Sequence, residues 1–258
     1  MDFNLSEEQI AFRDVVRRWV NEELPKDLMR KLEADEENYP FEIWDKLKAQ
    51  GFFGVGIPEE WGGLGGDVVT QMIFAREMAR TAGGLLWVWG LTSFGGAKTI
   101  GAVGSDEQKE RWLRPLSNGK GFSYCLSESE AGSDASALKT KAVRSGDKWI
   151  LSGSKKWISN AGESEFYTVL AVTDPDKGSK GISAFVVEKS DKGISFGAHE
   201  KKMGFKGSPT REVYFDQVEL ASDRMLGAEG TGFALAMKTL DHTRITIAAQ
   251  AIGLAQGA

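Results

Sequence analysis

The chain has 258 residues, and at roughly 150 residues per domain it can form two domains, or one large domain with an appendage. Its composition is 41% hydrophobic and 27% charged, which excludes a disordered, collagen-like or rod-shaped chain. The formal net charge of -5 gives no general positive field for binding nucleic acid or anionic lipid. The single cysteine, Cys125, cannot form an intramolecular disulfide, and two histidines are too few for a histidine-rich metal centre. We therefore expect a reducing compartment and no metal.

The N-terminus is acidic and lacks the basic start and apolar core of a secretory signal. The longest uncharged stretch lies between Arg80 and Lys98, contains five glycines and is too short to span a membrane. These features predict a cytoplasmic protein without a membrane span.

Residues up to about 120 have helical periodicity. Ser6 and Gln9 have the spacing of a capping box, and an apolar stripe follows until Pro25 stops the helix. Loops rich in glycine and proline separate further predicted helices at 41–50, 68–81, 85–103 and 105–116. The glycines of residues 62–66 have the wrong spacing for a dinucleotide-binding turn, so we interpret this cluster as a connecting loop.

Near Gly121 the apolar period changes from that of helices to that of strands. Strands are predicted around Trp149 and Leu151, after a turn at 145–147, and again at 166–172, 182–187 and 212–218. A helical pattern returns after residue 232, and its last 14 residues, 245–258, carry no charge. Such an apolar helix packs against the visible chain, against a partner subunit, or against a further domain that follows residue 258.

Two segments carry residue types that suit ligand binding. In residues 124–134 a strand runs into a loop of small and hydroxyl residues, where a ligand can approach the backbone. In residues 155–162, Trp157 and Ser159 lie two apart on one face of a strand and could flank a planar ring. Taken singly, each segment also fits an ordinary strand-end turn or a core tryptophan.

Together the two segments resemble the acyl-CoA dehydrogenases. The fixed positions of that family's first motif are filled by Cys125-Leu126-Ser127-Glu128, Ala131-Gly132-Ser133-Asp134 and Ala137. Residues 157–160, the loop at 57–63 and the segment 240–244 resemble further family segments in the same order. The resemblance implies an α+β multidomain fold with an N-terminal all-α domain (1–120), a middle β-barrel domain (121–226) and the start of a C-terminal α-helical bundle (227–258).

The resemblance also implies sites for FAD and for an acyl-CoA thioester. The residues implied for FAD are Tyr124, Leu126, Ser127, Gly132, Ser133, Trp157, Ile158 and Ser159. The residues implied for acyl-CoA are Ser133, Asp241, Thr243 and Arg244. The implied reaction of this oxidoreductase is α,β-dehydrogenation to the trans-2-enoyl-CoA, in which a carboxylate removes the α-proton and hydride leaves the β-carbon for the flavin. The resemblance further implies a role in fatty acid β-oxidation, an electron-transferring flavoprotein as partner, and a homo-oligomer, either dimer or homotetramer.

The catalytic base is not identified in this chain. The family's usual catalytic glutamate is expected beyond Ala258, and Thr243 stands where a subgroup carries it. Glu128, at a strand end, is typical of a backbone-capping or salt-bridged carboxylate. Ser129 and Glu130 replace a Pro-Gly pair that is common in the family.

Other residues have simpler interpretations. Cys125 is interpreted as a small buried residue, His242 as a helix-surface residue and His199 as a loop or strand residue. The tryptophans of residues 86–89 either pack in the core or border the acyl chain, where their bulk would favour short or medium chains.

Two alternatives keep the same fold. One is a related flavin oxidase or monooxygenase that passes electrons to oxygen. The other is a non-catalytic subunit that binds flavin or CoA and is completed by another chain, an interpretation that the threonine at position 243 favours.

Overall fold

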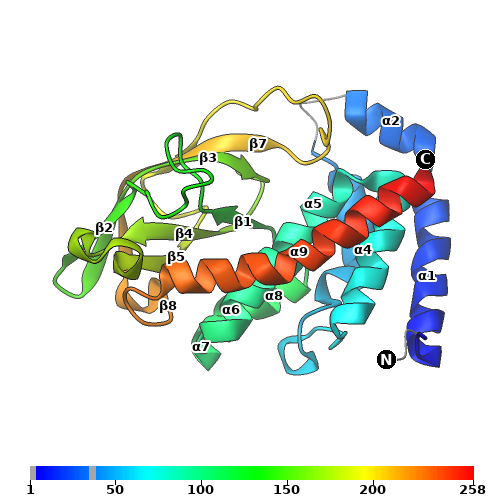
Figure 1. Cartoon of the computed structure of the whole chain (residues 1–258), viewed down its shortest axis with the longest axis horizontal. Helices are drawn as coiled ribbons and strands as arrows, with labels where there is room; N and C mark the ends of the chain where they lie inside the picture. The colour runs from blue at the N-terminus through cyan, green and yellow to red at the C-terminus, as the bar shows by residue number, and fades with distance from the viewer. Residues whose placement is uncertain (1–3, 35–38) are drawn as a thin grey trace.

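The computed structural model describes residues 4–34 and 39–258, so residues 1–3 of the acidic N-terminus lie outside the described part (Figure 1). Helices dominate the first part of the chain: α1 Glu7–Glu23, α2 Lys26–Ala34, α3 Phe41–Ala49, α4 Val68–Ala82, α5 Leu85–Gly90, α6 Ala97–Val103, α7 Asp106–Gln108 and α8 Arg114–Ser117. Two π-helical stretches, Leu91–Gly96 and Lys109–Leu113, connect α5 to α6 and α7 to α8.

Most of the predicted helices are confirmed. Both hydrogen bonds of the Ser6–Gln9 capping box are present at the start of α1. The predicted helix at 85–103 is continuous because the π-helical stretch bridges α5 and α6. Helix α2 was not predicted; Pro25 lacks an amide hydrogen and interrupts α1, but its fixed φ is compatible with a new helix beginning at the next residue.

The middle of the chain forms one eight-stranded sheet in the order β6-β7-β3-β2-β4-β5-β8, with β1 paired to β4. Its strands are β1 Phe122–Cys125, β2 Lys141–Ser145, β3 Lys148–Ser159, β4 Phe166–Val172, β5 Ile182–Glu188, β6 Ile194–Phe196, β7 Thr210–Ala221 and β8 Met225–Leu226. The predicted fold class is confirmed with one correction, because this sheet is not a closed barrel. In the described residues β6 and β8 end the sheet, and they are only three and two residues long.

The strand β4 is the branch point of the sheet. Its first half pairs in parallel with β1, from Phe122 opposite Phe166 to Cys125 opposite Val169. Its last residue, Val172, pairs with Lys141 at the start of β2. The chain therefore leaves the sheet after β1, makes an excursion through residues 126–140 and returns beside the same strand.

The strands β4 and β5 are buried on both faces of the sheet. In Figure 1, β3 and β7 lie above β4 and β5, with helices below. Alternate residues of β5 enter two cores: Phe185 and Val187 pack within the sheet layers, and Ala184 and Val186 pack with Leu235 of the last helix. Because both faces of β5 are covered, its sequence is a nearly continuous apolar run.

Helix α9, Gly232–Gly257, crosses the helical part and packs along α4 (Figure 1). The helices approach closely through glycine: a Cβ at Gly253 would lie 2.3 Å from the Arg76 carbonyl oxygen, and one at Gly257 would lie 1.8 Å from that of Arg80. The rest of the helix surface leaves Ile245, Ile247, Ile252 and Leu254 exposed. Within residues 4–34 and 39–258, no helix is sufficiently long and apolar to cross a membrane.

A buried carboxylate fixes α1 to α4. The side chain of Glu77 is fully buried and accepts two hydrogen bonds from Arg17, at 2.9 and 3.0 Å, and others from Arg76 and Arg80. Burial opposes ionisation of Glu77, but hydrogen bonding and the positive charge of Arg17, with help from Arg76, hold the pKa of this carboxyl below its ordinary value.

We expect Glu77→Gln to lower the free energy of unfolding at neutral pH by about 2 kcal/mol, because three guanidinium groups lose their shared anion. The depressed pKa means that Glu77 stabilises the fold above its unfolded-state pKa, and that this contribution is lost as the pH falls through the folded-state pKa. The difference between the variant and the parent, measured by urea unfolding, should therefore shrink in acid. The exposed Glu22→Gln is the control and should have little effect at any pH.

Candidate functional site

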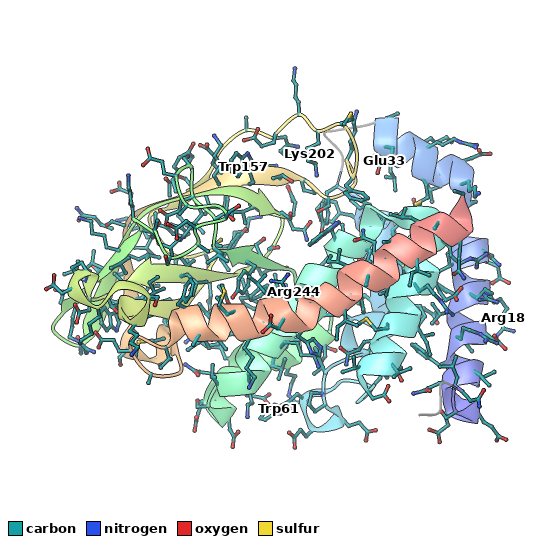
Figure 2. The ribbon with its side chains drawn as sticks, viewed as in Figure 1. Arg18, Glu33, Trp61, Trp157, Lys202 and Arg244 are labelled. Carbon is teal, nitrogen blue, oxygen red and sulfur yellow. The ribbon has the colours of Figure 1, made fainter. Side chains whose placement is uncertain are left out.

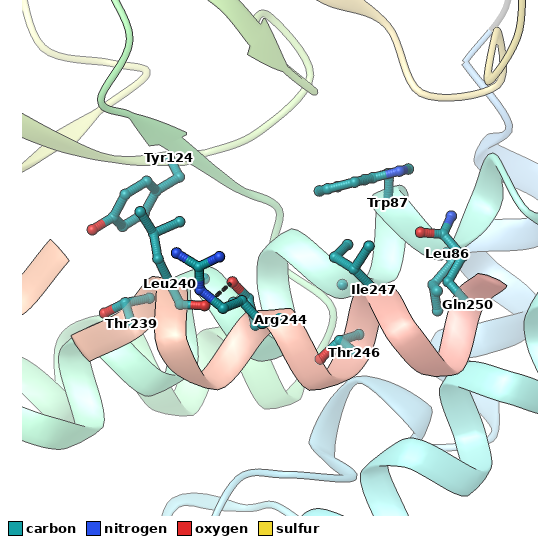
Figure 3. Close-up of a pocket in the computed structure, with 12 residues that line it drawn as sticks. Leu86, Trp87, Tyr124, Thr239, Leu240, Arg244, Thr246, Ile247 and Gln250 are labelled. Atoms are coloured by element: carbon teal, nitrogen blue, oxygen red, sulfur yellow. Dashed lines mark hydrogen bonds between the residues drawn. The ribbon is translucent and has the colours of Figure 1, made fainter. Parts of the chain in front are cut away.

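A mainly apolar pocket of about 320 Å³ lies where α5, β1 and α9 meet. Figure 3 shows Tyr124, Leu240 and Arg244 at one end of this pocket and Trp87, Leu86 and Gln250 at the other. Its complete lining is Leu86, Trp87, Gly90, Gly95, Tyr124, Thr239, Leu240, Thr243, Arg244, Thr246, Ile247 and Gln250. We call it the helix pocket.

Helix α9 supplies most of the polar groups of the helix pocket. The α9 residues Thr239, Thr243, Thr246 and Gln250 recur at helical spacing and lie on the side of the helix that lines the pocket. Of these four residues only Thr243 was predicted as a site residue, although polar residues at helical spacing are visible in the sequence of this segment. The Gln250 side chain is held by a 2.7 Å hydrogen bond from its Nε2 to the Gly83 carbonyl.

A second hollow of about 430 Å³ contains Trp157 and Ser159, and we call it the strand pocket. Trp157 is 54% exposed and has φ +58°, a left-handed conformation that is rare for a bulky residue. It lies at a register shift between Lys155 and Ile158, where β3 bulges away from β7. An exposed indole held in a strained conformation is a feature of binding sites. Figure 2 shows Trp157 close to the loop that carries Lys202.

Trp87 contributes to both pockets and stands between them. Its neighbour Trp89 is fully buried and donates a 2.7 Å hydrogen bond from Nε1 to the Phe52 carbonyl. The two interpretations of the tryptophan segment are therefore divided between its residues: Trp89 packs in the helical core, and Trp87 borders a cavity.

The loop after β1 is less enclosed. Leu126 packs into the core between helices and sheet, and Ser127 is half-buried. Gly132 and Ser133 are exposed and line neither pocket. Asp241 also lies outside both linings, and its carboxylate is 3.5 Å from the guanidinium of Arg244. The structure thus places Tyr124, Thr243 and Arg244 together in the helix pocket, and Trp157 and Ser159 together in the strand pocket. Ligand contacts of the other predicted site residues stay predictions.

Glu128 has structural partners on each carboxylate oxygen. It pairs with Lys155 at 2.7 Å and accepts backbone hydrogen bonds from Lys139 and Thr140, at 2.7 and 3.1 Å. Burial acts to raise the pKa of Glu128, but the Lys155 charge and these hydrogen bonds hold it below its ordinary value. A carboxylate so held is a capping and salt-bridged group, as its position at the strand end predicted.

The cysteine and the histidine that the sequence places near the site are both at least half-buried. Cys125 is fully buried, and burial raises the pKa of its thiol to about 12. His242 is half-buried rather than on the helix surface, because α9 packs against the helix that carries Lys98. Burial and then the charge of Lys98 lower the pKa of His242.

Comparison with known proteins gives a family for this arrangement. Residues 6–120 match the family described as acyl-CoA dehydrogenase, N-terminal domain, and residues 123–218 match acyl-CoA dehydrogenase, middle domain. A probable acyl-CoA dehydrogenase of Mycobacterium leprae is 46% identical over 99% of this chain and 65% of its own length. The chain thus spans slightly less than two thirds of that relative.

Solved structures agree with the sequence matches. Butyryl-CoA dehydrogenase from Megasphaera elsdenii has a TM-score of 0.93 and 37% identity, over 100% of this chain and 68% of that one. A structure described as the electron transferring flavoprotein of Acidaminococcus fermentans has a TM-score of 0.96 and 39% identity, over 100% of this chain and 67% of that one. Because both family models match and the fold is the same, this chain belongs to the acyl-CoA dehydrogenase family.

Proposed function

We propose that the protein is an FAD-dependent acyl-CoA dehydrogenase that converts an acyl-CoA thioester to the trans-2-enoyl-CoA. The observation that carries this proposal is the exposed, left-handed Trp157 beside Ser159, separated by Trp87 from an apolar pocket with polar groups on one side. We keep the domain limits 1–120, 121–226 and 227–258 as part of the proposal.

The residues present fit a flavin. Trp157 offers a flat apolar surface for an aromatic ring, and the Ser159 hydroxyl can hydrogen-bond to the ring edge. The exposed Gly132 and Ser133 offer backbone and hydroxyl groups without bulky side chains. With Tyr124, Leu126, Ser127 and Ile158, these residues would hold FAD, which supplies a hydride acceptor when bound.

The helix pocket is the proposed site for the acyl chain. Its walls are mainly apolar, which suits a hydrocarbon chain and excludes water from the reacting carbons. The indole of Trp87 closes one side, so we propose a short or medium chain, in keeping with the butyryl-CoA substrate named for one similar structure. At the other end Arg244 and Thr243, with Ser133 and Asp241, would contact the CoA portion.

No carboxylate lies among the described residues that line the helix pocket. Thr243 occupies its lining, but its Oγ donates a 3.0 Å hydrogen bond to the Leu240 carbonyl, and a hydroxyl is too weak a base to remove an α-proton unassisted. We therefore assign no base within residues 1–258. An electron-transferring flavoprotein as electron acceptor belongs to the same proposal, supported by the similarity to the Acidaminococcus fermentans structure. A homo-oligomeric assembly is proposed from membership of the family.

That no carboxylate lies among the described residues of the helix-pocket lining also favours a second candidate function. A chain that binds flavin and CoA but has no carboxylate at the acyl pocket could be a non-catalytic subunit completed by another protein. Both candidates predict that the protein binds flavin and CoA, but only the dehydrogenase predicts turnover of acyl-CoA.

We expect the intact protein to purify yellow with bound FAD. Trp157→Ala should weaken FAD binding by about tenfold, because ring packing contributes about 0.5–1.5 kcal/mol beyond the area it buries. Fluorescence titration of the apoprotein with FAD measures this. Phe41→Ala, which removes an exposed aromatic on α3, is the matched control and should bind like the parent. A parent protein that takes up no FAD would contradict the proposed function.

Arg244→Ala should weaken acyl-CoA binding by about tenfold while the FAD content stays unchanged, because a fixed positive charge at the pocket is lost. Spectral titration of the flavin with straight-chain acyl-CoAs of increasing length measures the affinity. Arg30→Ala, an exposed arginine on α2 that is also paired with an aspartate three residues away, serves as the control. Equal affinity in the parent and Arg244→Ala would mean that this side chain has no part in ligand binding.

The 258-residue chain expressed alone should show no acyl-CoA turnover, because proton removal needs a base within reach of the α-carbon. Anaerobic mixing with acyl-CoA should leave the visible absorbance of any bound flavin unbleached. Bleaching by this chain would place a base among its own residues and would rule out the non-catalytic candidate. Oxygen consumption, compared with reduction of an electron-transferring flavoprotein, tests the oxidase alternative in the intact protein.

A further inference from the structure

The excursion of residues 126–140 between β1 and β2 has few backbone hydrogen bonds within itself, and one of them joins the Ala137 amide to the Asp134 carbonyl at 3.2 Å. Glu128 and Ala131 form a two-way backbone bridge, with N-to-O distances of 3.0 and 3.2 Å. Beyond this bridge the loop is exposed from Gly132 to Asp134, and it carries several of the residues proposed for FAD. A loop with so little regular structure needs an anchor to present those residues in one geometry.

The anchor is a buried ion pair. The side chain of Lys155 on β3 is fully buried, and its Nζ donates to Glu128 at 2.7 Å and to the Leu126 carbonyl at 3.2 Å. The same Glu128 carboxylate accepts the backbone N–H groups of Lys139 and Thr140 at the far end of the loop. One pair thus joins the beginning of the loop, its end and the neighbouring strand.

The pair also lies beside the strand pocket. Lys155 immediately precedes the bulge that turns Trp157 outward, and the Lys156 amide donates a 2.9 Å hydrogen bond to the Ser127 carbonyl. Gly153 allows the loop end to lie against β3, since a Cβ there would be 2.7 Å from the Cα of Thr140. Any shift of the pair would therefore move the loop and Trp157 together.

We propose that the buried Lys155–Glu128 pair is a positioning element for FAD, holding the 126–140 loop and the Trp157–Ser159 strand end in a single arrangement. This inference rests on the proposed flavin function. Neither side chain lines the two pockets, so the pair acts through the groups that it holds.

Stability alone does not explain such a pair. Replacing a buried ion pair by apolar residues of similar volume is often neutral or stabilising, whereas removing one partner leaves an uncompensated charge. The apolar replacement would remove the acceptor of the Lys139 and Thr140 amides while the sheet core is preserved. It therefore separates the positioning role from folding.

The experiment uses the intact protein and the double variant Glu128→Leu/Lys155→Met. A matched control is available in the same loop: the exposed pair of Glu130 and Lys139, whose side chains are 72% and 73% exposed, changed to Glu130→Leu/Lys139→Met. Glu128→Asp is a second test variant, because it keeps the charge but shortens the reach of the carboxylate. Apoproteins are titrated with FAD, and the visible circular dichroism of the bound flavin reports its geometry.

We expect Glu128→Leu/Lys155→Met to bind FAD at least tenfold more weakly and with altered visible dichroism, and Glu128→Asp to weaken binding by several-fold. The control pair should stay within twofold of the parent. Parent-like affinity and dichroism in either test variant would overturn the proposal, and an unfolded double variant leaves Glu128→Asp to decide. A parent that binds no FAD would overturn the proposed function itself, which distinguishes the two failures.

Discussion

The side chain of Asn160 joins three parts of the molecule at the point where the two pockets meet. Its Nδ2 donates to the Trp87 carbonyl of α5 at 3.3 Å, and its Oδ1 accepts from the Ser208 hydroxyl at 3.0 Å. Asn160 is buried with φ +60°, a left-handed conformation that asparagine tolerates better than most residues. The position of Trp87 between the pockets therefore depends on a turn at the end of β3, in a different layer of the fold.

The buried charges of this chain serve the arrangement of elements. Glu77 holds α1 against α4, and Glu128 holds the loop after β1 against β3. Each carboxylate is satisfied by several donors, as burial of a charge requires. The helix pocket itself is mainly apolar, and its polar groups are hydroxyls, the Gln250 amide and Arg244 at the rim. This division suits a site that must exclude water while keeping a few fixed polar contacts.

Helix α9 connects the sheet and the helical core. Near its start Leu235 packs under β5, and near its end glycine at 253 lets it approach the backbone of α4. Between these contacts Thr243, Arg244 and Thr246 line the helix pocket. One helix therefore forms part of the cavity wall and also fixes the distance between the two layers that enclose the cavity.

The local elements and the family resemblance are predictable from the amino-acid sequence. The capping box at Ser6, the strand at 166–172 and the turn at Gly146 depend on neighbours within a few residues, and the motif around Ser133 is a contiguous pattern. Three features became visible only in the folded chain: Trp87 borders a cavity, Lys155 is buried, and the sheet is open. These outcomes depend on partners such as Glu128 and Lys155, or Tyr124 and Thr239, that are distant in the chain, and no local period encodes such contacts.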